Sequence, residues 1–397
     1  MDFEGVKKYI KSFVSYEDVI TFKYGDDVFD LDRVRDFVDQ FGIDFSDLKF
    51  VHVAGSKGKG TTSSLISDYL SKNGYSTGLF TSPYMFEMTE CFKVDGENIA
   101  TDVFVKIIEE LKTFIERNGC KLTYFELLVV IALKYFSELK LDYVVMEVGL
   151  GGRLDATNII VPDVSVITLV EKEHVEILGN NLSDILDEKL GIIKNDVPVV
   201  VGYQSDVGLK LIKKKSEGRE VVFVQEEEVI DLEDNDFAKV KNGKTAYLVL
   251  KKLLGEVDDH VFLKVFEGFR FLGRFDVRQI DRKDVVFDMA HTKSSILNLI
   301  EGLKVTFPNK KFVFLVSLLK GKDVESILTL INSISERIVF TSSHLERGYK
   351  GFDLAEFVDG DVIDNPEEAY ARVFEDLKRD QVLVVTGSHF LLSMVMP

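Results

Sequence analysis

The chain has 397 residues, of which 46% are hydrophobic and 29% charged, so it can form two or three globular domains with substantial cores. Its formal net charge is −18 at pH 7. A surface of this sign repels nucleic acid and anionic membranes, and we expect neither as a partner. The two cysteines, Cys91 and Cys120, argue against a disulfide framework or a cysteine-based zinc site. Residues 1–8 have no signal-peptide pattern and no apolar run is long enough to span a bilayer, so the sequence predicts a cytoplasmic protein.

Strand-like apolar runs alternate with amphipathic helical runs along most of the chain, which is typical of α/β layers with mostly parallel sheets. In the first part of the chain, we predict strands at residues 50–54, 142–148, 164–168 and 197–201. Helices are predicted at residues 61–73, 107–116, 125–136 and 182–194. Residues 226–244 are polar and weakly patterned, and we interpret them as an excursion before the next helix.

The pattern resets around Gly273, where a second α/β series begins. This series has predicted strands at residues 284–288, 311–317, 337–341 and 382–386, and helices at 324–333 and 366–377. We therefore predict one domain over residues 1–273 and a smaller one over residues 274–397.

A glycine-rich turn follows the first predicted strand, with the sequence Gly55-Ser56-Lys57-Gly58-Lys59-Gly60-Thr61-Thr62. Glycines allow several backbone N–H groups to point at one anion, and the next helix adds its positive N-terminal end. Lys59 can reach the outer phosphates of a nucleotide, and the Thr61 hydroxyl can ligate Mg²⁺. The extra glycine before Thr61 departs from G-x-x-x-x-G-K-[ST], so the turn by itself also fits a tight connection between strand and helix.

Glu147 ends the strand predicted at residues 142–148, at the edge of the sheet where ligands of α/β proteins bind. Its carboxylate suits Mg²⁺, which prefers oxygen ligands. The glycine-rich residues after it predict a loop that can close over a substrate. A structural alternative is an ion pair between Glu147 and Arg153.

His174 and Lys189 come later in the same part of the chain. His174 follows a strand end and could complete a metal shell, although a lone histidine is more often a surface residue, here beside acidic neighbours. Lys189 lies in an amphipathic helix, where spacing alone indicates a surface lysine.

Together these segments resemble the folylpolyglutamate synthase/dihydrofolate synthase family of the Mur-ligase superfamily. Its motif E-V-G-L-G-G-R-L-D-A-T-N matches residues 147–158 at every position. Its motifs G-T-N-G-K-G-[ST], F-T-S-P-H, D-H-x-x-x-L-G, E-K-x-G-I-I-K, G-R-[FW]-[ED] and T-G-S correspond to residues 55–61, 80–84, 173–179, 188–194, 273–276 and 386–388. The motifs occur in order over nearly the whole chain.

This resemblance implies a P-loop-type ATP-binding domain with a mostly parallel sheet, followed by a smaller Rossmann-like glutamate-ligase domain. The implied enzyme is a monomer that uses ATP and Mg²⁺ to join L-glutamate to a folate or pteroate acceptor through an acyl phosphate. The implied nucleotide contacts are Gly55, Ser56, Lys57, Gly58, Lys59, Gly60, Thr61, Thr62, Arg274 and Asp288. The implied Mg²⁺ ligands are Thr61, Ser82, Glu147 and His174.

The resemblance also implies catalytic roles for Lys59, Lys189, Asp288 and His291, with Lys189 carbamylated by CO₂ so that it becomes an anion able to support a metal. The implied substrate contacts are Thr81, Phe125, Gly151, Gly152, Leu154 and Asp155.

Several positions depart from the family pattern. The motif D-G-A-H-N-P is replaced by Asp288-Met289-Ala290-His291-Thr292-Lys293, and Tyr84 stands where F-T-S-P-H has histidine. Thr245 occupies the position expected for an adenine-facing asparagine. Bifunctional bacterial members have an arginine that helps to hold dihydropteroate, and Glu87 aligns with it. We therefore favour the folylpolyglutamate synthase reaction over dihydrofolate synthase. The alternatives are a ligase of another carboxylate and a nucleotide-binding protein without catalysis. A dinucleotide-dependent oxidoreductase is a more distant one, because Gly55–Gly60 does not give the spacing G-x-G-x-x-G.

Overall fold

The computed structural model describes residues 1–14, 30–343 and 347–396. They divide into two compact units. Unit 1 comprises Met1–Leu232 and Lys239–Gly268, and unit 2 comprises Glu233–Ala238 and Phe269–Pro397. No helix among the described residues is long and apolar enough to cross a membrane.

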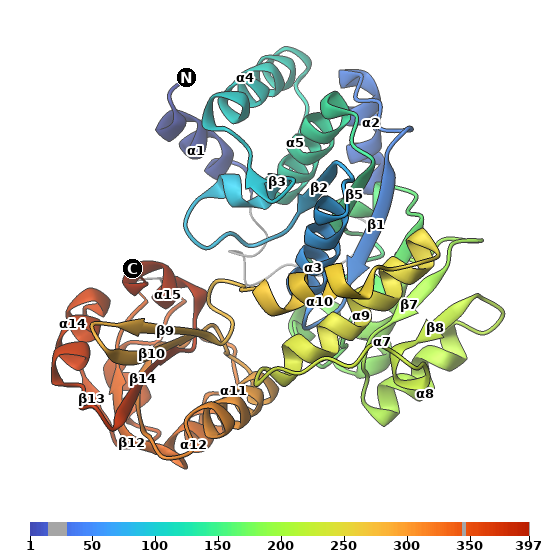
Figure 1. Ribbon diagram of the computed structural model, residues 1–397. Coiled ribbons are helices and arrows are strands. Elements are labelled where there is room, and N and C mark those ends of the chain that lie inside the picture. Colours follow the sequence, from blue (N-terminus) through green and yellow to red (C-terminus); the bar gives the residue numbers. More distant parts are fainter. Residues whose placement is uncertain (15–29, 344–346, 397) are drawn as a thin grey trace. The chain divides into compact units, whose positions relative to one another are not determined.

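The strands of unit 1 form an eight-stranded sheet that is parallel except for a short antiparallel edge (Figure 1). Their order is β4 (Glu97–Asn98), β3 (Phe92–Val94), β2 (Thr77–Phe80), β5 (Tyr143–Glu147), β1 (Lys49–Ala54), β6 (Val164–Ile167), β7 (Val199–Val201) and β8 (Val221–Phe223). The first strand, β1, lies in the middle, with His52 opposite Met146 of β5 and Ser165 of β6. The carboxyl ends of β1, β5 and β6 therefore meet at one edge, which is where the motifs lie.

Helices cover both faces of this sheet. The helices in the first half of unit 1 are α1 (Phe3–Lys11), α2 (Leu31–Phe41), α3 (Lys59–Lys72), α4 (Thr101–Asn118) and α5 (Tyr124–Leu139). Those in the second half are α6 (Val175–Leu178), α7 (Leu182–Leu190), α8 (Asp206–Lys215), α9 (Phe237–Leu254) and α10 (Asp259–Gly268). Short 3₁₀ turns occur at η1 (Met88–Cys91), η2 (Ala156–Ile159) and η3 (Val224–Glu226).

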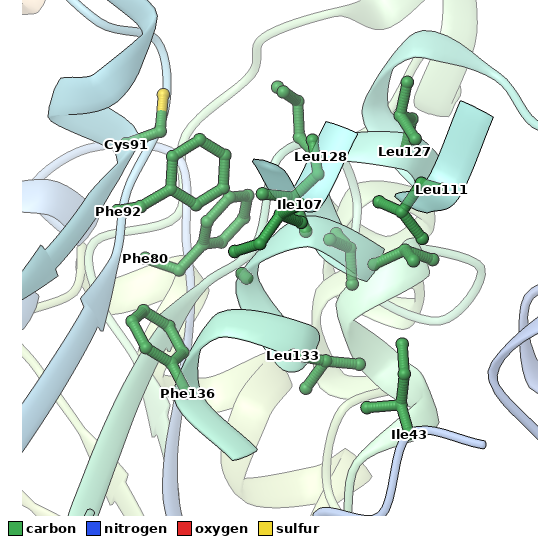
Figure 2. Packing of buried hydrophobic residues seen from close by; sticks show 14 of the residues in the cluster. Ile43, Phe80, Cys91, Phe92, Ile107, Leu111, Leu127, Leu128, Leu133 and Phe136 are labelled. Atoms are coloured by element: carbon green, nitrogen blue, oxygen red, sulfur yellow. The ribbon is translucent and has the colours of Figure 1, made fainter. Parts of the chain in front are cut away.

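The largest core of unit 1 is formed by α1, α2, α4 and α5 against one face of the sheet. Figure 2 shows part of it, with Phe80 and Phe92 from the strands facing Ile107, Leu128 and Phe136 from the helices. A second core lies between α6, α7, α8 and the strands β6 and β7. The first core packs against β2 and β5, on one side of β1, and the second packs against β6 and β7, on the other side.

Unit 2 has its own six-stranded sheet and its own core. The strand order is β13 (Asp361–Val362), β12 (Ser335–Phe340), β11 (Lys311–Val316), β14 (Gln381–Thr386), β10 (Lys283–Asp288) and β9 (Asp276–Ile280), of which only β9 is antiparallel. The helices are α11 (Lys293–Thr306), α12 (Val324–Asn332), α13 (Gly351–Ala355), α14 (Pro366–Asp376) and α15 (His389–Val395). The predicted α/β class, with two mostly parallel sheets, is confirmed. The boundary predicted at Gly273 lies four residues after Phe269, where the main part of unit 2 begins, and remains a prediction.

Three predictions differ from the structure by four residues or more. The helix predicted at residues 107–116 extends over Thr101–Asn118. The helix predicted at residues 182–194 ends at Leu190, because Gly191 packs against the backbone of Arg153 and the Gly191 carbonyl accepts a hydrogen bond from Asn158. The excursion predicted at residues 226–244 stops at Phe237, where α9 begins. The inner face of α9 includes the buried polar residues Lys239 and Thr245, so its apolar period is weak in the sequence.

Candidate active site

The glycine-rich turn between β1 and α3 can be built only with glycine at two positions. Gly55 has φ +152° and Gly58 has φ +88°. A Cβ atom on Gly55 would overlap the Thr168 hydroxyl, and one on Gly58 would overlap the Asn242 side chain. The turn therefore follows β1 closely and ends directly at the N-terminus of α3, as the phosphate-loop prediction requires.

Hydrogen bonds tie this turn to the segment after β6. The backbone N–H groups of Ser56 and Lys57 donate to the Leu169 carbonyl at 2.8 and 3.1 Å. The Ser56 hydroxyl lies 3.0 Å from both the N–H and the carbonyl oxygen of Glu171. The turn and the residues around His174 are thus held side by side.

Three lysines gather around this turn. The ammonium groups of Lys59 and Lys189 donate to the Gly55 carbonyl at 3.2 and 2.9 Å. Lys57 pairs with Glu173 at 3.6 Å, and Lys189 pairs with the other oxygen of the same carboxylate at 3.3 Å. One carboxylate faces three cations, so this cluster of four side chains carries a net positive charge in a chain whose net charge is −18.

The charges in this cluster shift each other's pKa. Burial alone would raise the pKa of Glu173, but the ammonium groups of Lys189, Lys59 and Lys57 outweigh it and lower the pKa to about 2. Burial lowers the pKa of Lys189 to about 8, against the opposing effect of Glu173. Lys189 therefore exchanges between an ammonium and a neutral amine near neutral pH.

The interpretation of Lys189 as a surface residue is wrong. Its side chain is only 2% exposed and points from α7 towards the turn. Spacing within α7 cannot show this, because the contact that buries Lys189 comes from Gly55, more than a hundred residues earlier in the chain.

Glu147 lies at the end of β5 and is buried. One of its carboxylate oxygens accepts a hydrogen bond from the Ser82 N–H at 3.3 Å, so the two predicted ligands are neighbours. Arg153, the partner in the structural alternative, forms an ion pair with Glu188 at 3.1 Å.

The predicted metal ligands are Thr61, Ser82, Glu147 and His174. Three of them offer oxygen atoms, which suits a hard cation. His174 is exposed and is the N-cap residue directly before α6, with φ 47°. No three His, Cys, Asp or Glu side chains in the described part of the chain are grouped to hold a metal by themselves. These residues fit Mg²⁺ only as partners of phosphate and water oxygens, which is its usual coordination in nucleotide sites.

The segment at residues 149–158 is braced, whereas the sequence predicts a loop able to close. Asp155 is buried and accepts hydrogen bonds from the Gly149 and Leu150 N–H groups at 3.0 and 2.9 Å. The Arg153 N–H donates to the Glu188 carbonyl at 2.7 Å, and the Asn158 amide donates to the Arg153 carbonyl at 2.9 Å. The segment thus holds a fixed shape against α7.

Of the predicted substrate contacts Thr81, Phe125, Gly151, Gly152, Leu154 and Asp155, the last four belong to this segment and Phe125 packs against it. The Phe125 ring packs against Gly149 so closely that a Cβ there would be 2.5 Å from it. Gly152 faces the carbonyl groups of Glu188 and Lys189. Gly151 has φ +68°, and the Thr81 N–H donates to the Cys91 carbonyl at 3.3 Å. Because Asp155 already accepts several internal hydrogen bonds, its geometry supports a positioning role, and its contact with substrate remains a prediction.

Asn242 is a candidate that the sequence interpretation missed. It lies on α9 with its side chain against Gly58 of the turn. Thr245, to which the adenine-facing position was aligned, is buried, and its hydroxyl donates to the Lys241 carbonyl at 2.9 Å. An asparagine three positions before Thr245 on the same helix face was the available signal.

In unit 2, Asp288 ends β10 and accepts hydrogen bonds from the Phe275 and Ala290 N–H groups at 2.7 and 2.8 Å. Burial raises its pKa to about 6. The His291 Nδ1–H donates a hydrogen bond to the Met289 carbonyl at 2.9 Å. Arg274 stacks on the Phe271 ring, with its guanidinium carbon 5.2 Å from the ring centre. The predicted residues of unit 2 are thus gathered around the start of β9 and the end of β10.

Comparison with known proteins decides the family. Residues 53–261, more than half of the chain, match the Mur ligase middle domain, and residues 273–389 match the glutamate ligase domain of Mur ligases. The chain belongs to the Mur ligase family.

The resemblance to the folylpolyglutamate synthase/dihydrofolate synthase branch is confirmed as well. This Mur ligase is 26% identical over 423 residues to the dihydrofolate synthase/folylpolyglutamate synthase of Bacillus subtilis, with 96% of the chain and 98% of that protein covered. Among solved structures it is similar to Escherichia coli FolC in complex with DHPP and ADP, with a TM-score of 0.87 at 25% identity, covering 100% and 97% of the two chains. The bifunctional Yersinia pestis enzyme, complexed with AMPPNP and Mn ion, gives a TM-score of 0.86 at the same identity and coverage.

Proposed function

We propose that this Mur ligase joins L-glutamate to the carboxylate of a folate at the expense of ATP, with folylpolyglutamate synthase as its main activity. The observation that carries the proposal is the group of three lysines at the glycine-rich turn: Lys59 and Lys189 donate to the Gly55 carbonyl, and Lys57 and Lys189 pair with the Glu173 carboxylate. Such a site can bring two anions, a nucleotide triphosphate and an acceptor carboxylate, together in an acidic protein.

The reaction begins when the acceptor carboxylate attacks the γ-phosphorus of ATP. The bond to the β,γ-bridging oxygen breaks, and ADP leaves with its electron pair. Lys59, with the N–H groups of the turn, stabilises the charge on the transferred phosphoryl group. The product is an acyl phosphate, in which the carbonyl carbon has acquired a good leaving group.

In the second step, the neutral amine of L-glutamate attacks this carbonyl carbon. An amide bond forms, inorganic phosphate leaves, and the amine gives up a proton. The implied residues of unit 2 for this chemistry are Asp288 and His291. Asp288, whose pKa is about 6, is largely ionised at neutral pH.

The residues that would hold Mg²⁺ are Thr61, Ser82, Glu147 and His174. The ion would supply positive charge to the transferring phosphoryl group and to the leaving ADP. Lys189 would support this site as a carbamate, formed when its neutral amine adds CO₂ and releases a proton. Its burial and its pKa of about 8 supply the neutral amine at moderate pH.

The dihydrofolate synthase reaction is the second candidate, because bacterial relatives carry both names. The residue at position 87, a glutamate, argues against dihydrofolate synthase activity. This residue forms an ion pair with Lys7 at 3.6 Å and caps η1, where bifunctional members are expected to have an arginine. A carboxylate there cannot take over the contacts of a guanidinium group.

ADP release with Mg²⁺, ATP and L-glutamate tests the proposal, with either tetrahydrofolate or dihydropteroate as the acceptor. We expect turnover with tetrahydrofolate and at most weak turnover with dihydropteroate. Dominant turnover with dihydropteroate would reverse the assignment. If the protein binds ATP but is silent with both acceptors, a panel of other carboxylates separates a ligase of different specificity from a nucleotide-binding protein without catalysis.

A further inference from the structure

His52 is a fully buried histidine that the proposed reaction does not use. It lies in the middle of β1, with no exposed surface. Its Nε2 atom is 2.8 Å from the Thr157 hydroxyl oxygen. Its Nδ1 atom is also buried and has no hydrogen-bond partner among the residues that the structure describes. Proteins rarely leave a buried polar atom without a hydrogen-bond partner, so the environment of this histidine needs an explanation.

Thr157 continues this contact to Asp155. The Thr157 hydroxyl and the Thr157 N–H both donate to one oxygen of the Asp155 carboxylate, the N–H at 2.9 Å. The other oxygen accepts from the Gly149 and Leu150 N–H groups. Burial raises the pKa of Asp155 above its usual value, and the hydrogen bonds act against burial. Three of these donors are amides, which cannot accept in return, so the hydrogen bonds favour the ionised carboxylate.

The direction of the hydrogen bonds follows from this count. An ionised carboxylate can only accept, so the one hydroxyl hydrogen of Thr157 is used on Asp155. The Thr157 oxygen must then accept from His52, which requires the hydrogen of the imidazole ring to be on Nε2. Burial and the charge of Lys194 lower the pKa of His52 to about 3, so the ring is neutral and its tautomer is the only variable.

We propose that His52 is a positioning residue, which acts through Thr157 and Asp155 to fix the braced segment 149–158 between Glu147 and Lys189. This inference rests on the proposed function for the roles of those two residues. The segment begins two residues after Glu147. Its Gly152 faces the Glu188 and Lys189 carbonyl groups, and its Arg153 N–H bonds to Glu188. A change in the hydrogen bonds between His52, Thr157 and Asp155 should therefore alter the positions of both Glu147 and Lys189.

The tautomer can be measured without turnover. In the whole protein labelled with ¹⁵N-histidine, we expect one ring to show a protonated Nε2 and a bare Nδ1 from about pH 5.5 to 8. Its signals are assigned to His52 by their loss in His52→Gln. A protonated Nδ1 would mean that Thr157 donates to His52 rather than to Asp155, and it would overturn the proposal even if the protein proves to be an active ligase.

Two variants test the link to the site. His52→Leu removes the donor, and Thr157→Val removes the middle of the chain. We expect each to raise the half-saturating Mg²⁺ concentration and the KM for ATP by about tenfold, the lower end for groups behind a metal ligand, with a smaller change in kcat. His52→Gln places an N–H close to the position of Nε2 and should restore both constants to within about twofold.

Thr341→Val is the matched control, since it deletes a buried threonine hydroxyl in unit 2, where the group donates to the Asp364 carbonyl. It should leave the Mg²⁺ and ATP constants unchanged. Equal effects of His52→Leu and His52→Gln would reduce His52 to a packing residue and sink the idea. If His52→Leu does not fold, Thr157→Val and the tautomer measurement decide. If neither acceptor supports turnover, the affinity for Mg²⁺ and ADP, measured by calorimetric titration, replaces the kinetic constants.

Discussion

Lys189 is a buried amine between a carboxylate and a backbone carbonyl. Its two possible chemical states, an ammonium and a carbamate, have opposite charges. As an ammonium group, it would cross-link Glu173 and Gly55. As a carbamate, it would carry a negative charge towards the candidate metal site. Arginine separates the two states, because its guanidinium stays protonated and cannot add CO₂.

We expect Lys189→Arg to fold with a free energy of unfolding within about 1 kcal/mol of the parent, since a cation still faces Glu173. Turnover should fall by about 100-fold, the range for loss of a group that supports a metal. ADP release and chemical denaturation measure the two effects. An Arg variant with full activity would show that the ammonium, and not the carbamate, is the working state.

The pKa of Lys189 adds a pH dependence to the same state. Below a pKa of about 8 the amine is mostly protonated and cannot attack CO₂, so carbamate formation should become faster as the pH rises towards 8. After removal of CO₂, we expect activity to return sooner at pH 8 than at pH 6.5 when CO₂ is added back to the same dissolved CO₂ concentration at both pH values. Recovery at equal rates, or recovery favoured by acid, would contradict this order.

In the proposed function, Glu87 is the residue that we expect to favour tetrahydrofolate over dihydropteroate as the acceptor. Glu87→Arg would restore the cation that bifunctional members use, and the ratio of kcat/KM for dihydropteroate to that for tetrahydrofolate should rise by about 10-fold or more, as for a hydrogen bond to a charged group. Glu87→Gln is the control, because it removes the charge and the ion pair with Lys7 but adds no cation. If both variants change the ratio equally, loss of the carboxylate and not gain of the guanidinium is responsible.

At the scale of the element, the turn between β1 and α3 depends on the absence of a side chain at Gly58. Gly58→Ala places a Cβ in a left-handed conformation, which costs about 1–2 kcal/mol, and drives it into Asn242. We expect a larger loss of stability than this conformational cost, together with weaker ADP binding, measured by denaturation and titration.

Gly74→Ala provides the control, because Gly74 has almost the same φ, +90°, but nothing within 4 Å of the added Cβ. It should show only the conformational cost and normal ADP binding. In the double variant Gly58→Ala with Asn242→Ala, the stability should return towards that of Gly74→Ala. If Gly58→Ala and Gly74→Ala are equally stable and bind ADP alike, the contact with Asn242 has no role in the turn.

Much of the fold could be predicted because buried parallel strands appear in the sequence as continuous apolar runs. The strands β1, β5 and β10 were found in this way, and the turn after β1 was found from its glycines. Helix α9 was only partly found, because buried polar residues weaken its period. The missing part concerns contacts between distant segments: the burial of Lys189 under Gly55 and the position of Asn242 against Gly58 depend on the tertiary fold, which no local pattern encodes.

At the scale of the molecule, the chain consists of two units with separate cores. Chains of this kind often unfold in more than one step. We therefore expect scanning calorimetry to resolve two transitions. Thr341→Val removes a buried hydrogen bond from unit 2 and should lower one of them by about 1 kcal/mol in free energy, which assigns that transition to unit 2.

Nucleotide binding then reports which unit holds the phosphates. The glycine-rich turn and the three lysines belong to unit 1. Mg²⁺ and ADP should therefore raise the unfolding temperature of the transition that Thr341→Val leaves unchanged. At an ADP concentration 100 times Kd, the stabilisation should be about 2.7 kcal/mol. Lys59→Ala is the variant that should remove most of this increase, because the Lys59 ammonium faces the turn from the first residue of α3. If ADP raised only the transition that Thr341→Val lowers, the phosphates would have to bind in unit 2, and the assignment of the turn as the phosphate loop would be wrong.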